Sequence, residues 1–181
     1  MLDQDISLSM KDLGLITIER IQIELGRLKE RIQTDSREMH NTHSQKGLLR
    51  SGATIKAQIR ISQDAFFELR DICIKHLRVM ADEAFFLNEA SVSNVKSSIS
   101  EMFSELNDLT FETMTKSCEL SSKPELRERC MPEVDNESAS TLSEVNLFID
   151  ERIISRRNRG IKGVIGSLFS AVKKLFTSGT G

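Results

Sequence analysis

The sequence predicts an all-α protein, an antiparallel helical bundle of three to four long helices with coiled-coil-like seams plus a C-terminal amphipathic helix. Helix breakers are rare, with two prolines and nine glycines in 181 residues. That is too few for a β-sandwich, which needs a turn about every ten residues. Apolar residues instead recur at spacings of three and four over long stretches, the periodicity of helices that pack along a seam.

The first predicted helix covers residues 10–46, after a flexible N-terminus at residues 1–8. Ser9 and Asp12 form a weak capping box at its start. Lys46 and Gly47 are typical of a helix end, where a basic residue is followed by glycine. The apolar seam of this helix consists of Ile18, Ile21, Leu25, Leu28 and Ile32.

The second and third predicted helices cover residues 52–88 and 92–120 and complete a bundle at 9–120. The stretch "GLLRSGAT" (47–54) separates the first two helices, and "NEASVSN" (88–94) separates the next two. Because the seam changes phase across the second break, a helical hairpin is favoured over one unbroken rod. The second seam consists of Ile55, Ile59, Ser62, Phe66, Leu69, Cys73, His76 and Met80, and the third of Val92, Val95, Ile99, Met102, Leu106 and Leu109.

Residues 121–137 are interpreted as a linker because they hold both prolines, Pro124 and Pro132, among acidic and serine residues. A fourth helix is predicted at 138–155. Thr141 and Glu144 form a capping box there. Its apolar residues are Leu142, Val145, Phe148, Ile149 and Ile153.

The charge of the chain is unevenly distributed. Residues 156–181 contain six basic residues and no acidic one, so the other 155 residues hold 19 basic and 27 acidic residues, a net charge of −8. An acidic body joined to a basic terminal segment indicates that this segment seeks an anionic partner.

That segment, 156–181, has the pattern of a complete amphipathic helix. On a helical projection the apolar residues from Ile161 to Phe176 fall within an arc of roughly 160°, with polar and basic residues opposite. A helix of this length is too short to cross a bilayer but fits its interface. The predicted membrane- or partner-binding residues are Arg156, Arg157, Arg159, Ile161, Lys162, Val164, Ile165, Leu168, Phe169, Val172, Lys173, Lys174, Leu175 and Phe176.

Other partners remain open for the same segment. It could pack as a core helix of the bundle, dock into a groove of a partner protein, or contact nucleic acid through its arginines, which has less support. Aromatic side chains on which nucleic-acid bases could stack are few, because the chain has no Tyr and no Trp. The heptad-like seams also predict self-association.

The three cysteines, Cys73, Cys118 and Cys130, are odd in number and lack C-x-x-C spacing. They indicate neither a disulfide framework nor a zinc module, so no metal and no cofactor is predicted. A reducing compartment follows, and the polar start "MLDQDISLSMKD" is unlike a signal peptide. No run reaches the ~20 apolar residues of a membrane span. The predicted location is the cytoplasm, with peripheral membrane contact.

Signatures of catalysis are scarce. His40 and His43 share a helix face and could meet at a metal, but two ligands do not make a zinc site. The stretch "RDICIKH" (70–76) resembles the Arg-x(4–6)-His motif of the HEPN family, small all-α domains that often act as ribonucleases when dimeric. The resemblance spans seven residues and implies His76 as general acid or base and Arg70 as phosphate clamp.

The sequence as a whole favours a non-enzymatic helical interaction protein whose C-terminal helix binds a membrane surface or a partner. The alternatives are a HEPN-like ribonuclease using Arg70 and His76, and a structural or assembly protein of a multi-subunit particle whose last helix docks on a neighbour.

Overall fold

The computed structural model describes residues 2–82 and 89–155, and these form a helical bundle. The helices are α1 (Leu2–Gln45), α2 (Gly52–Asp82), α3 (Glu89–Leu120) and α4 (Arg127–Phe148). A short 3₁₀ helix, η2 (Pro124–Leu126), precedes α4, and a π-helical segment, η3 (Ile149–Ile154), continues it. The described residues contain no strand, which confirms the predicted all-α class.

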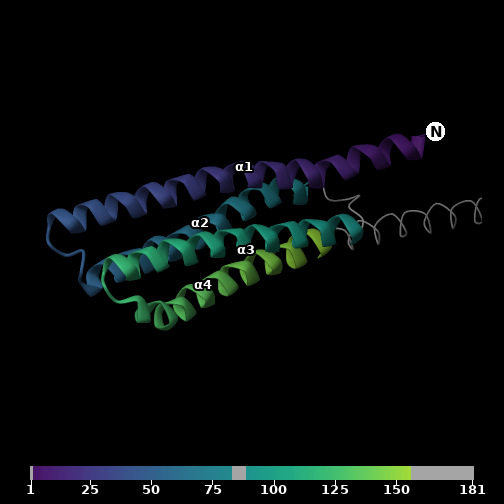
Figure 1. Cartoon of the computed structure of the whole chain (residues 1–181). Helices are drawn as coiled ribbons and strands as arrows, with labels where there is room; N and C mark the ends of the chain where they lie inside the picture. Colours follow the sequence, from purple (N-terminus) through teal and green to yellow (C-terminus); the bar gives the residue numbers. More distant parts are fainter. Residues whose placement is uncertain (1, 83–88, 156–181) are drawn as a thin grey trace, which may run out of the picture.

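Successive helices run in opposite directions, so both described connections lie at one end of the bundle (Figure 1). We call this end, formed by residues 46–51 and 121–126, the turn end. Helices α2 and α3 contact each other in the middle, and α1 and α4 each pack against both of them. Helix α1 begins, and α4 with η3 ends, at the opposite end (Figure 1). The described part of the chain therefore ends far from the turn end.

The predicted seams form the core. The apolar seam residues of α1 and α3 named above are all buried, and so are most of those of α2. Phe66 and Phe103 stack across the α2–α3 contact with ring centroids 6.2 Å apart. Ile59 and His76 are the two members of the second seam that remain partly exposed. Since the chain's own helices cover the seams, self-association would have to use other surfaces.

The predicted helix stop at Gly47 is confirmed. Gly47 has a φ of +69°. Its N–H donates to Ser44 O at 3.1 Å, and the N–H of Leu48 donates to His43 O at 2.7 Å. These two bonds are the Schellman motif, in which glycine adopts the left-handed conformation without a Cβ clash. On the other side of the turn, Ser51 Oγ accepts from the N–H of Ala53 at 3.2 Å and caps α2.

The end of α3 has the same two hydrogen bonds, but a serine takes the glycine's place. The N–H of Ser122 donates to Glu119 O and that of Lys123 to Cys118 O, each at 2.9 Å. Ser122 is the one non-glycine residue of the described chain with positive φ, at 57°. The left-handed conformation costs an L-residue roughly 1–2 kcal/mol. The sequence gives no signal for this motif beyond the polar pair Ser121–Ser122.

We therefore expect Ser122→Gly to raise the free energy of unfolding by about 1 kcal/mol, because it removes that cost and keeps both hydrogen bonds. Urea unfolding measures the change. The control is Ser100→Gly, an exposed position inside α3, which should lower stability by about 1 kcal/mol. Two changes of the same sign would contradict the assignment of strain to Ser122.

Two predicted helix starts and one predicted linker are corrected. Helix α1 begins at Leu2 instead of residue 10. Helix α3 begins at Glu89, so most of the predicted break at 88–94 is helical. The second helix was predicted to reach residue 88; α2 is described to Asp82, and 83–88 lie outside the described residues.

The predicted linker at 121–137 is the third correction, since α4 starts at Arg127 and not at residue 138. Met131 and Val134 are buried in the described structure, in phase with Thr141 and Val145 further along the helix. This extra buried stripe stabilises the helix through the sequence that was assigned to the linker. Pro132 lies inside α4 on its exposed side, where it costs one backbone hydrogen bond but meets no core residue.

Candidate functional site

The turn-end half of the bundle contains a buried network of polar side chains. His40 Nε2 lies 2.8 Å from Ser117 Oγ, and Ser117 Oγ lies 3.3 Å from Gln58 Oε1. The Gln58 amide in turn donates to Thr113 Oγ1 at 3.1 Å. The network joins α1, α2 and α3, and Gln58 and Ser117 are fully buried. Such networks are favourable only when nearly every member is satisfied, so they fix the mutual register of the helices.

The protonation state of His40 follows from this geometry. When His40 Nε2 carries the imidazole proton it donates to Ser117 Oγ, and the Ser117 proton then goes to Gln58 Oε1 or Thr113 O. Burial lowers the pKa of His40, and the nearby Lys116 and His43 lower it further. The imidazole is consequently neutral near pH 7.

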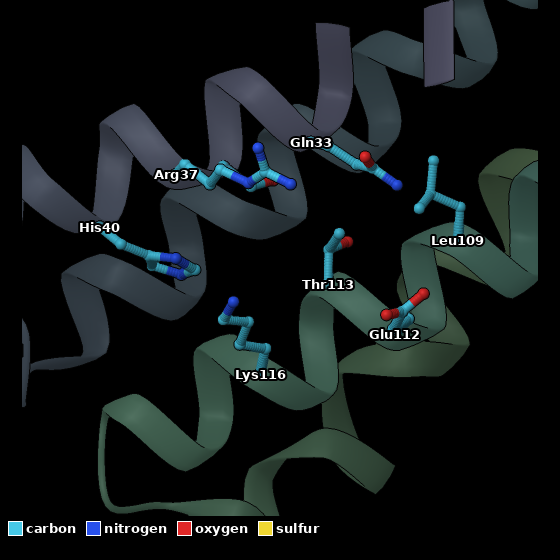
Figure 2. A pocket seen from close by; sticks show the side chains of 8 residues that line it. Gln33, Arg37, His40, Leu109, Glu112, Thr113 and Lys116 are labelled. Atoms are coloured by element: carbon cyan, nitrogen blue, oxygen red, sulfur yellow. The ribbon is translucent and has the colours of Figure 1, made fainter. Parts of the chain in front are cut away.

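A small cavity of about 110 Å³ lies beside this network, between α1 and α3 (Figure 2). Arg37 and His40 extend into it from α1, opposite Thr113 and Lys116 of α3 (Figure 2). Its lining is completed by Gln33, Ser36, Leu109 and Glu112.

Donors without a partner among the described residues line the cavity. Ser36 is 4% exposed, yet its hydroxyl has no hydrogen-bond partner in the described part of the chain. Arg37 and Lys116 are exposed, and neither has a salt-bridge partner in the described part of the chain. A buried hydroxyl without a partner costs about 1–3 kcal/mol. This unsatisfied hydroxyl lies in the same cavity lining as Arg37 and Lys116, which have no salt-bridge partner among the described residues.

A larger groove of about 660 Å³ runs between α2 and α4. Its floor is apolar, with Ile55, Ile59 and Leu126 beside Phe67, and the thiol of Cys130 lies in it. Burial raises the pKa of Cys130, and the Glu133 carboxylate raises it further. The thiol is therefore protonated at neutral pH and a weak nucleophile.

The other two thiols are also unreactive. Cys73 is fully buried, and burial raises its pKa to about 12. Burial likewise raises the pKa of Cys118, with a further contribution from Cys130. All three cysteines are free. Cys73 and Cys118 fill space in the core, as the sequence pattern of Cys73 predicts.

Arg70 and His76, the residues of the HEPN resemblance, face different neighbours. Arg70 pairs with Glu144 of α4 at 3.0 Å and lies 5.3 Å from the centre of the Phe67 ring. His76 Nε2 lies 2.8 Å from Glu24 Oε1 of α1, and hydrogen bonds from His76 and Lys75 lower the pKa of Glu24. The chain does not bring Arg70 and His76 together in one site. A ribonuclease site built on them stays a prediction.

His40 and His43 also diverge. His40 enters the polar network, whereas His43 Nδ1 lies 2.8 Å from Thr54 Oγ1 beside the α1–α2 turn. Among residues 2–82 and 89–155 no group of three or more His, Cys, Asp and Glu side chains is placed to hold a metal ion.

The predicted membrane- or partner-binding residues, Arg156 to Phe176, lie outside the described residues. Within the described ranges, no helix combines the length and the apolar character that a membrane span requires.

Comparison of the chain with protein-family models, with characterised proteins and with solved structures finds no match to any of them.

The cavity was not identified from the sequence. From the sequence, His40 is singled out only as a possible metal ligand beside His43, and Ser36 is not predicted to contribute to a site. A signal was present, however. Ser36 and His40 follow Ile32 at spacings of four, so the seam continues in polar form.

Proposed function

We propose that this protein is a non-enzymatic helical interaction protein that attaches to an anionic membrane surface through residues 156–181. The division of Ile161–Phe176 into an apolar arc and a polar, basic arc carries the proposal. The remaining 155 residues, with a net charge of −8, cannot supply that attraction themselves.

The bundle supports this proposal by its arrangement. Its described helices bury their own seams against one another. The described chain ends with η3, at the end of the bundle away from the turns (Figure 1).

Each basic residue near an anionic leaflet contributes about 1 kcal/mol at most. Six of them, together with a buried apolar face, are enough for reversible binding. The attachment should therefore weaken as salt rises, because the electrostatic part is screened.

The test is co-sedimentation of the full chain with vesicles of phosphatidylserine and phosphatidylcholine. We expect Phe169→Glu to reduce the bound fraction at least tenfold, since it places a charge in the apolar arc. The matched control is Ser170→Glu, which adds the same charge in the polar arc and should weaken binding only a few-fold. Equal losses from the two variants, or equal binding to vesicles of pure phosphatidylcholine, would refute the proposal.

A further inference from the structure

The cavity between α1 and α3 has features that the proposed function does not use. Arg37, His40 and Lys116 surround one half of it (Figure 2). Ser36 also lines the cavity, and its buried hydroxyl has no hydrogen-bond partner among the described residues. The described basic side chains that pack across helix interfaces elsewhere, such as Lys29, Arg70 and Lys96, pair with carboxylates. Arg37 and Lys116 do not.

We propose that this cavity is a binding site for a small phosphate group, either free phosphate or the phosphate of a small monoester. A guanidinium offers a planar pair of donors that matches two phosphate oxygens, and an ammonium adds a point charge. The buried Ser36 hydroxyl adds a neutral donor to the lining. A volume of about 110 Å³ is enough for a phosphate group of a few heavy atoms.

The charge around the cavity favours a dianion at one side of it. Glu112 is the one carboxylate in the lining, and it lies beside Leu109 and Thr113, away from His40 (Figure 2). The phosphate would sit towards His40 and Lys116. There it would offset the Lys116 charge that helps to keep His40 neutral.

Water alone accounts less well for this arrangement. A water bridging the cavity would satisfy Ser36, but it would not require two unpaired cations at the rim. An anion satisfies the hydroxyl and both cations at once.

The test is calorimetric titration of the full chain with inorganic phosphate, at constant ionic strength set with chloride. We expect saturable binding and a loss of about tenfold to a hundredfold in affinity for Arg37→Gln and for Lys116→Gln. The control is Arg27→Gln, an exposed and unpaired arginine of α1 outside the cavity, which should leave the affinity unchanged.

Serine variants give a second, sharper readout. Ser36→Ala should raise the Tm of the phosphate-free protein by about 2–4 °C, because it removes an unsatisfied hydroxyl, and should also weaken phosphate binding. Ser62 is another buried hydroxyl without a partner, and it lies outside the cavity. Ser62→Ala should raise the Tm in the same way while leaving phosphate affinity intact.

Titration with glycerol phosphate distinguishes the sources. Tighter binding than inorganic phosphate identifies a phosphorylated small molecule as the ligand class, and weaker binding identifies free phosphate. The proposal is overturned if inorganic phosphate shows no saturable binding up to about 20 mM. It is also overturned if Arg27→Gln weakens binding as much as Arg37→Gln, or if Ser36→Ala leaves the affinity unchanged. Vesicle binding by Arg37→Gln should stay unaltered, so this test is independent of the membrane proposal.

Discussion

Phe66→Ala should lower the free energy of unfolding by about 3–5 kcal/mol, the largest loss we expect from a single truncation in this chain. Phe66 is fully buried and stacks on Phe103 at the centre of the bundle, where α2 and α3 meet. Truncation removes the buried contacts of the ring and leaves a cavity, which long, straight helices cannot close by moving together. Urea unfolding followed by circular dichroism measures the loss.

Phe67, the next residue, is the matched control because it has the same side chain about 100° further round α2, where it is exposed. It is 38% exposed and contacts the guanidinium of Arg70. We expect Phe67→Ala to cost only about 1 kcal/mol, from partial burial and the lost cation–π contact. If Phe66→Ala fails to fold, Phe66→Leu should still unfold measurably earlier than the wild type. Equal costs for the two alanine variants would contradict the described core.

The contrast between Phe66 and Phe67 shows what the sequence predicts well. Phe66 belongs to a seam that repeats at intervals of three and four, and every apolar seam residue of α1 and α3 is buried. Apolar periodicity predicts burial because a long helix has only one way to turn a continuous stripe inward. The end of α1 at Gly47 can also be predicted from nearby residues, because this helix end needs only a residue that tolerates positive φ.

The misplaced linker shows where local signals fail. Pro132 indicates a break, and its neighbours are polar, so a local interpretation ends the helix there. What sustains α4 is the burial of Met131 and Val134 against the other helices, a tertiary contribution that outweighs a single lost hydrogen bond. The cavity was missed for a related reason. Ser36 and His40 look like a fading, solvated helix until α3 supplies Ser117 and Thr113 beside them.

The two ends of the bundle consequently differ in chemistry. The described chain ends where α4 and η3 finish, and the sequence that follows is the basic segment for which we propose membrane attachment. The turn-end half contains the polar network and the cavity for which we propose phosphate binding. Because α1 and α3 are single continuous helices, a change at the cavity that shifts one helix along the other would reach the far end. The register of these helices depends on the His40–Ser117 contact.

The polar network should also make the protein less stable in mild acid. Burial, together with Lys116 and His43, lowers the pKa of His40 in the folded chain below its ordinary value of 6.5. Below that pH the unfolded chain binds a proton that the folded chain excludes. The contribution of His40 to stability is therefore fully present above pH 6.5 and is lost as the pH falls towards the folded pKa. One group changes stability by at most about 1.4 kcal/mol per pH unit.

We expect His40→Gln to flatten the dependence of the unfolding free energy on pH between 7 and 5, because an amide can replace the hydrogen bond but cannot titrate. The control is Ser117→Ala, which breaks the same contact yet keeps the imidazole. It should lower stability throughout while retaining the slope. The carboxylate of Glu24, whose pKa is lowered from 4.5, loses its contribution only below that pH, so the two windows are separate. A slope that His40→Gln leaves unchanged would show that another group carries the acid sensitivity.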